Sequence, residues 1–247
     1  MPRWLDGRVL ENRRWTETLF SLRVEAPRLA FEAGQFVKLA LDIGGERVAR
    51  PFSFVNPPQN PVLEFYGVVV PEGPLSPRLA RLAPGDRIYL ADRPSGFLVL
   101  SELPEGETLW LLATGTGIAP FLSILCTETP WRRYRQVMLV HAARFSRELA
   151  YQELIAEISG LKKDHFRYIQ FVSRESAPGT LSGRIPAAIL DGRLERAAGR
   201  ALSPEGSQLM LCGNPAMLRD AQAALAARGL KKHRRRSPGQ ITVESFW

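Results

Sequence analysis

The sequence predicts a protein of two domains: an antiparallel β-barrel in residues 1–100, followed in residues 104–247 by a Rossmann-like parallel α/β sheet. Three observations predict this class. The chain has 247 residues, which exceeds the commonest size of a single domain. Its first part consists of short β-rich runs separated by turn residues. Its second part alternates continuous apolar runs with helical segments, which favours a parallel sheet with right-handed crossovers.

The first domain is expected to form a small closed barrel, because short strands and turn signals alternate at regular spacing. A further strand is expected to carry residues 50–55. One short helix interrupts the pattern, where Ser76 is a candidate N-cap and Pro77 suits the first turn. The β-rich runs are residues 19–24, 36–41, 62–70 and 87–90.

The second domain begins with the apolar run 109–113, which is typical of a strand buried on both faces. Residues 216–228 form the clearest helix, since Asn214 is a good N-cap, Pro215 suits the first turn and Gly229 ends the pattern. Three more strands are expected at residues 137–140, 168–172 and 209–212.

The composition favours anionic partners and an organic cofactor. The net charge is +8, from 33 Lys and Arg against 25 Asp and Glu, and such a chain attracts nucleotides, acidic proteins or nucleic acid. Two cysteines and three histidines, without a Cys-x-x-Cys pair, exclude an ordinary zinc or iron–sulfur site. No apolar run approaches about 20 residues and the N-terminus lacks the layout of a signal peptide, so a cytoplasmic protein without a membrane segment is expected. No oligomerisation signal stands out, and a monomer is expected.

The densest basic cluster, residues 231–236, has two interpretations. It is either a solvated surface segment or a docking patch for an acidic redox protein. Nucleic-acid binding is disfavoured, because neither interleaved aromatic residues nor a helix-turn-helix pattern accompanies the charge.

Residues 50–53 combine a cation, an aromatic ring and a hydroxyl group, in the order Arg-Pro-Phe-Ser. This set suits a flavin. The Arg50 guanidinium group can bind a phosphate with two donors, the Phe52 ring can cover the isoalloxazine, and the Ser53 hydroxyl can face its reactive edge.

Small residues follow the first apolar run of the second domain, where residues 114–117 read Thr-Gly-Thr-Gly and open a helix. Ligands of open α/β sheets bind beyond the carboxyl ends of the strands, and a glycine-rich turn at a helix N-terminus admits a pyrophosphate. The motif is only part of the dinucleotide fingerprint and is weak evidence alone.

Basic residues follow the next strands: Arg144 after the second run, Ser173 and Arg174 after the third, and Arg184 after a glycine-containing turn. An NAD-preferring site would usually place an acidic residue after the second strand, whereas a basic residue suits a 2′-phosphate. Each arginine alone also fits an ordinary surface charge, but their shared placement favours NADP. The histidines at positions 141 and 165 are expected to be structural.

Taken together, these motifs resemble the bacterial ferredoxin–NADP⁺ reductases, also called flavodoxin reductases. The likeness runs nearly end to end, and a terminal tryptophan such as Trp247 is typical of one bacterial subgroup. The motifs that carry the resemblance are residues 33–36, 50–53, 63–66, 75–79, 112–116, 140–144, 172–175, 183–186 and 211–215.

The resemblance implies a six-stranded antiparallel Greek-key barrel that holds FAD and a second domain that holds NADP(H), whose C-terminal tail returns to the flavin. Arg50 would bind the FAD pyrophosphate, Phe52 would pack on the flavin, and Ser53 would point toward flavin N5. The other FAD contacts would be Pro51, Tyr66, Gly67, Val68, Val69, Pro74, Leu75, Ser76, Thr116, Phe246 and Trp247. The NADP contacts would be Ala143, Arg144, Ser173, Arg174, Arg184, Asn214, Pro215 and Asp220.

The implied activity is FAD-dependent electron transfer between NADPH and ferredoxin or flavodoxin, by hydride transfer to flavin N5 and then one-electron steps. Ser53, Cys212 and Glu244 are the catalytic candidates: Ser53 near N5, Cys212 beside the nicotinamide, and Glu244 in a proton relay. A buried strand-end cysteine without a catalytic role is the alternative for Cys212. The family usually has Tyr where Phe52 stands, and often where Phe246 stands.

Two other functions compete with this hypothesis. An NADPH-dependent flavin or quinone reductase would use the same motifs but pass electrons to small acceptors. A non-enzymatic basic module that binds nucleic acid through residues 231–236 would leave the motifs around Arg50 and Gly115 unexplained.

Overall fold

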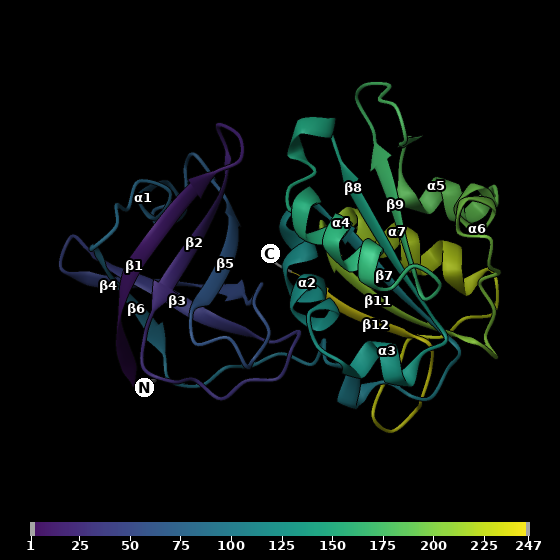
Figure 1. Ribbon diagram of the computed structural model, residues 1–247, viewed down its shortest axis with the longest axis horizontal. Coiled ribbons are helices and arrows are strands. Elements are labelled where there is room, and N and C mark those ends of the chain that lie inside the picture. Colours follow the sequence, from purple (N-terminus) through teal and green to yellow (C-terminus); the bar gives the residue numbers. More distant parts are fainter. Residues whose placement is uncertain (1–2, 246–247) are drawn as a thin grey trace. The chain divides into compact units, whose positions relative to one another are not determined.

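The computed structural model describes residues 3–245, which form two compact units (Figure 1). Of the described residues, 3–99 and Ala119–Thr127 form the first unit, and Leu100–Ile118 and 128–245 form the second. The sequence assigned residues 119–127 to the second domain, but they cluster with the barrel. Within the described residues, no helix is both long and apolar enough to cross a membrane.

The first unit is a six-stranded antiparallel barrel, as the sequence predicts. The strand order is β4-β3-β6-β1-β2-β5. A bridge between Phe54 and Phe65, supported by the Val55 N–H bond to the Glu64 carbonyl at 2.8 Å, joins the two outer strands. The strands are β1 (Trp4–Arg14), β2 (Leu19–Glu25), β3 (Phe36–Ile43), β4 (Glu46–Ser53), β5 (Leu63–Val68) and β6 (Arg87–Ala91).

Strand β1 was missed by the sequence analysis, because only Gly7 and Val9 of its eleven residues are buried and its pattern shows little alternation. Helix α1 (Ser76–Leu79) is present, but the expected cap is wrong. Leu75 occupies the N-cap position without a side-chain cap, and the Ser76 hydroxyl accepts a hydrogen bond from the Val70 N–H at 2.9 Å. That bond ties the segment after β5 to the helix.

Helix α2 (Ala119–Leu125) belongs to the barrel unit. The buried Ser123 hydroxyl donates to the Asn56 carbonyl at 2.7 Å, and the Asn56 side chain accepts from the Glu64 N–H at 2.7 Å. The helix is thereby bonded to the connection between β5 and β4, the strand that carries the predicted flavin motif at residues 50–53.

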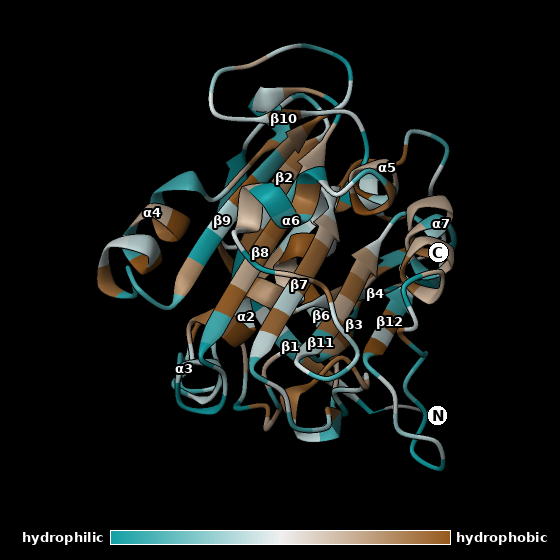
Figure 2. Cartoon of the chain, turned by 90° about the vertical axis from the view of Figure 1, so that its right-hand side faces the viewer, coloured by the Kyte–Doolittle hydropathy of each residue, from teal (hydrophilic) through white to brown (hydrophobic). Residues whose placement is uncertain are grey.

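The second unit is a parallel sheet with the order β10-β9-β8-β7-β11-β12, which confirms the Rossmann-like class (Figure 2). The central strands β8, β7 and β11 are buried along most of their length, because helices cover both faces. Two edge strands were not predicted: residues 181–182 were interpreted as part of a turn, and the sequence of the final strand mixes polar and apolar residues. The strands are β7 (Thr108–Thr114), β8 (Gln136–Ala143), β9 (Phe166–Val172), β10 (Leu181–Ser182), β11 (Ser207–Gly213) and β12 (Ile241–Ser245).

Helix α7 (Pro215–Ala226) confirms the predicted N-terminus, since the Asn214 side chain accepts from the N–H groups of Ala216 and Met217. Helices α5, α6 and α7 share one apolar cluster with one face of the sheet, and α4 contacts β9 from the opposite face. The remaining elements are η1 (Leu100–Glu102), η2 (Gly115–Ile118), α3 (Thr129–Arg133), η3 (Ser146–Glu148), α4 (Gln152–Leu161), α5 (Ile185–Leu190) and α6 (Arg193–Ala198).

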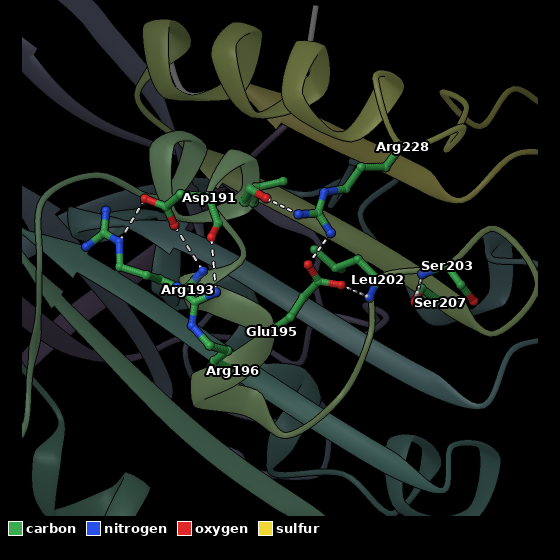
Figure 3. A network of polar contacts seen from close by, with 9 residues as sticks. Asp191, Arg193, Glu195, Arg196, Leu202, Ser203, Ser207 and Arg228 are labelled. Atoms are coloured by element: carbon green, nitrogen blue, oxygen red, sulfur yellow. Dashed lines mark hydrogen bonds and ion pairs between the residues drawn. The ribbon is translucent and has the colours of Figure 1, made fainter.

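A polar network joins these three helices beside the apolar cluster (Figure 3). The Arg228 guanidinium group, after α7, pairs with Glu195 of α6 and donates to the Ile189 carbonyl of α5. The other Glu195 oxygen accepts from the Leu202 N–H at 2.9 Å. Both side chains of the pair are mostly covered, so the contact is better protected from solvent than an ordinary surface ion pair.

Candidate functional sites

The flavin motif lies at the end of β4, next to β5. An added Cβ atom at Gly67 would lie 2.9 Å from a Phe52 ring carbon and 2.8 Å from the Phe20 ring, so only glycine lets both rings approach the β5 backbone. Ser53 is buried, and its hydroxyl oxygen has no hydrogen-bond partner among residues 3–245. Tyr66 is buried beside these groups, with its ring edge-on to Trp15 at 6.5 Å between centroids.

The remaining candidates for flavin contacts differ in exposure. The Arg50 guanidinium group donates to the Ala49 carbonyl at 2.7 Å and is otherwise open to solvent. Val69 is held by the bond from its N–H to the Thr18 carbonyl at 2.7 Å, and Pro74 accepts from the Arg78 side chain at 2.6 Å. Of the remaining candidates, Leu75 is buried, Val68 and Ser76 are half-buried, and Pro51 is exposed.

These residues fit a flavin nucleotide. A buried hydroxyl oxygen without a partner is costly, and a flavin edge would supply one. The ring of Phe52, half-buried against Gly67, offers an aromatic face, and the exposed Arg50 offers a phosphate-binding cation.

In the second unit, β7 and β11 are neighbours, and the order of the sheet reverses between them. An added Cβ at Gly117 would lie 2.4 Å from the Cys212 carbonyl oxygen, and one at Gly213 would lie 2.2 Å from the Thr114 hydroxyl. The Asn214 N–H donates to that hydroxyl at 2.9 Å. The loops after the two strands are therefore packed backbone to backbone at the point where ligands of such sheets bind.

His141, on β8, is fully buried next to this loop. Its Nε2 atom lies 3.1 Å from the Gly115 carbonyl oxygen, and burial lowers the pKa of its imidazole to about 4. His165 is exposed at the opposite end of the sheet, just before β9.

The arginine-bearing loops after β8 and β9 are bonded together. The Arg174 N–H donates to the Arg144 carbonyl at 2.9 Å, and the Ser173 N–H donates to the Ala143 carbonyl at 3.1 Å. Arg184 stands at the N-terminus of α5, on the segment after β10, where the Gly183 N–H bonds to the Val172 carbonyl at 3.0 Å. The guanidinium groups of Arg144, Arg174 and Arg184 are exposed and make no hydrogen bond or ion pair with any described residue.

Two carboxylates that were not among the predicted site residues accept hydrogen bonds from main-chain N–H groups of these loops. Glu148 accepts from the Arg144 N–H at 2.9 Å, and Glu175 accepts from the Ser146 N–H at 2.6 Å. The hydrogen bonds from Ser146 lower the pKa of Glu175. The one available signal was the acidic residue directly after the Ser-Arg pair at 173–174.

The remaining candidates are spread over the end of the same sheet. Cys212 is buried at the end of β11, opposite Glu244 of β12 in the strand register, and burial followed by the Glu244 charge raises the pKa of its thiol well above the usual range. Thr116 lies in η2, half-buried, while Asp220 is exposed on α7. Phe246 and Trp247 lie outside the described residues.

Comparison with known proteins identifies the family. The family model of the oxidoreductase NAD-binding domain matches residues 111–223. Over 100% of both chains, this protein is 51% identical to a flavodoxin/ferredoxin–NADP reductase of Shigella flexneri and 50% identical to one of Escherichia coli strain K12. The crystal structure of a ferredoxin NADP⁺ reductase from Neisseria gonorrhoeae with bound FAD and NADP matches with a TM-score of 0.95 and 34% identity, covering 100% of both chains. The resemblance and the fold class predicted from the motifs are confirmed, and the chain belongs to the flavodoxin/ferredoxin–NADP reductase family.

Proposed function

We propose that this protein is an FAD-dependent reductase that transfers electrons between NADPH and ferredoxin or flavodoxin. The observation that carries the proposal furthest is the set of three exposed guanidinium groups, those of Arg144, Arg174 and Arg184, at the ligand-binding end of a parallel sheet. The names of the full-length relatives support the same activity.

FAD is proposed to bind the barrel unit. Arg50 binds its pyrophosphate, the Phe52 ring covers the isoalloxazine, and the Ser53 hydroxyl hydrogen-bonds at the edge that carries N5. Because Phe52 lacks the phenolic hydroxyl usual in the family, its contribution is stacking alone. The backbone of residues 66–69 and 74–76 lines the cofactor, and Pro51, Thr116, Phe246 and Trp247 are the further proposed contacts.

NADP(H) is proposed to bind the second unit. Arg144, Arg174 and Arg184 hold the 2′-phosphate, with Ser173 and Ala143 beside them. The backbone of the loop 114–117 receives the pyrophosphate. Asn214, Pro215 and Asp220 are the further contacts, at the start of α7.

When bound, FAD supplies a hydride acceptor that also passes on single electrons. Three side chains are proposed to serve it. Ser53 donates or accepts a hydrogen bond at the reactive edge. Cys212, whose raised pKa keeps it a neutral thiol, packs beside the nicotinamide and leaves no competing charge there. Glu244 relays a proton between solvent and the flavin.

The proposed protein partner is an acidic redox protein, and the net charge of +8 would speed its approach. Comparing ferredoxin with ferricyanide as acceptor tests this. Ferredoxin reduction should slow steeply with added salt, because exposed charges are screened, whereas ferricyanide reduction should respond less. Equal rates with quinones or free flavins, and no gain with ferredoxin or flavodoxin, would favour a reductase of small acceptors. A cytoplasmic, monomeric protein is proposed as well, to be tested by cell fractionation and by light scattering.

An anaerobic titration of the purified protein tests the cofactor assignments. A yellow protein whose long-wavelength flavin band is bleached far more readily by NADPH than by NADH would agree with the proposal. A protein that stays colourless after FAD is added would overturn it. Equal bleaching by NADH would retain the enzyme class but remove the roles of the three arginines.

A further inference from the structure

Buried His141 makes contacts on both of its ring nitrogens. Nε2 lies 3.1 Å from the Gly115 carbonyl oxygen, and Nδ1 lies 3.5 Å from the Tyr168 hydroxyl. Because a carbonyl only accepts, Nε2 must carry the proton, which leaves Nδ1 as an acceptor for the tyrosine O–H. The low pKa of the imidazole keeps it neutral, and burial raises the pKa of Tyr168 to about 12, so the tyrosine keeps its proton.

The chain of hydrogen bonds continues to the surface. The Gln152 amide, on α4, donates to the Tyr168 hydroxyl at 2.9 Å, and its carbonyl oxygen accepts from the Gln170 amide at 2.7 Å. Every donor therefore points the same way, from Gln170 through Gln152, Tyr168 and His141 to the carbonyl of Gly115. Such directed chains set one tautomer and one ring orientation for the histidine.

The Gly115 carbonyl belongs to the loop proposed to receive the pyrophosphate. Gly115 has φ of +53°, a conformation that glycine enters and leaves easily, so its following peptide is prone to flip. That peptide is trans, as are all peptides among the described residues, and its N–H points opposite to its carbonyl. Because that carbonyl is directed at His141 Nε2, the Thr116 N–H is directed away from the imidazole ring.

We propose that His141 is a positioning residue for the dinucleotide: its Nε2–H holds the Gly115 carbonyl against the sheet and so presents the Thr116 N–H, not a carbonyl oxygen, to the pyrophosphate of NADP(H). The inference rests on the proposed function, which places that pyrophosphate at residues 114–117. Tyr168 acts one step further back, by fixing the histidine tautomer.

The test compares two ligands on the flavin-loaded protein by titration calorimetry. NADP⁺ uses both the arginines and the glycine-rich loop, whereas adenosine 2′-monophosphate lacks the pyrophosphate and uses the arginines alone. His141→Leu should weaken NADP⁺ binding roughly tenfold and change the affinity for adenosine 2′-monophosphate by less than about twofold. His141→Gln keeps a donor near Nε2 and should recover most of the loss.

Tyr168→Phe retains the histidine and leaves its Nδ1 without a donor. It should weaken NADP⁺ binding by about two- to threefold and leave the affinity for adenosine 2′-monophosphate unchanged. If His141→Leu fails to fold, this variant still tests the inference. His165→Gln, at the exposed histidine, is the matched control. Nitrogen chemical shifts of the wild-type imidazole should report the Nε2–H tautomer.

Wild-type NADP⁺ affinity in folded His141→Leu and Tyr168→Phe would overturn the inference. So would an equal loss for both ligands, which would mean general damage to the domain. If the wild-type protein binds NADP⁺ no more tightly than adenosine 2′-monophosphate, the proposed function of the loop fails, and the role of His141 falls with it.

Discussion

The two units offer different kinds of groups to their proposed nucleotides. The barrel presents a buried hydroxyl, a half-buried ring and a glycine where the end of β4 lies beside β5. The parallel sheet presents exposed guanidinium groups on loops, braced by carboxylates on main-chain N–H groups. The first arrangement selects by shape and orientation, and the second by charge. Three exposed arginines are proposed for NADP(H), against the single exposed Arg50 for FAD. We therefore expect added salt to weaken the preference for NADPH over NADH more than it weakens flavin binding.

The largest effect should come from Arg144→Ala combined with Arg174→Ala. Hydrogen bonds to charged groups contribute about 1.5–3 kcal/mol each, so kcat/KM for NADPH should fall at least roughly 100-fold, with little change for NADH. Flavin content should be unaffected, since both side chains lie in the second unit. Arg167→Ala, at an exposed arginine near the other end of β9, is the control. An equal fall for NADPH and NADH would contradict the charge-based role.

Acid should destabilise the sheet unit through His141. The pKa of its imidazole falls from 6.5 to about 4 on folding, so the unfolded chain binds more protons between these values. Stability is therefore complete above pH 6.5 and is lost as the pH falls to about 4, by about 3 kcal/mol in total. Denaturant unfolding at several pH values measures this loss.

His141→Gln should flatten that dependence of stability on pH, and His165→Gln serves as the control variant. If the stability of His141→Gln still falls between pH 6.5 and about 4, other groups cause the loss.

Gly117→Ala should destabilise the sheet unit by about 1–3 kcal/mol, because its Cβ would meet the Cys212 carbonyl oxygen at 2.4 Å, and a backbone atom cannot move aside as a side chain can. Gly160→Ala, in α4, meets nothing within 4 Å and should stabilise by about 0.4–1 kcal/mol. Thermal unfolding of the two variants gives the comparison. Equal unfolding midpoints would mean that the loops after β7 and β11 are less tightly packed than their geometry indicates.

The smallest effect should come from Ser53→Ala in the barrel. Without flavin, the change removes a buried hydroxyl that lacks a partner and should raise stability by up to about 1 kcal/mol. With flavin, hydride transfer measured by stopped flow should slow several-fold. Ser123→Ala is the matched control, because that buried hydroxyl is bonded to Asn56 and its loss should cost about 1 kcal/mol. A flavin-loaded Ser53→Ala with wild-type hydride transfer would exclude a role at N5.

Local patterns predicted much of the molecule. Continuous apolar runs marked β7, β8, β9 and β11, and the Asn214–Pro215 pair marked the start of α7. Strands β1, β10 and β12 were not predicted, because an edge or largely exposed strand carries a short or mixed pattern that periodicity cannot separate from a loop. The Ser76 cap was wrong because the hydroxyl had a competing donor, the Val70 N–H, which a one-dimensional pattern does not reveal.

By itself, the sequence determined the class of the two units, the motif at residues 50–53, the glycine-rich loop and the placement of arginines after strands, because each depends on residue type and on neighbours along the chain. Only the tertiary structure decided which groups meet across strands: Gly67 with Phe52, Gly117 with Cys212, Glu175 with Ser146, and His141 with Gly115. These pairs depend on sheet order and register, and a histidine that reads as an ordinary core residue therefore acquires a role only once β8 lies beside the loop after β7.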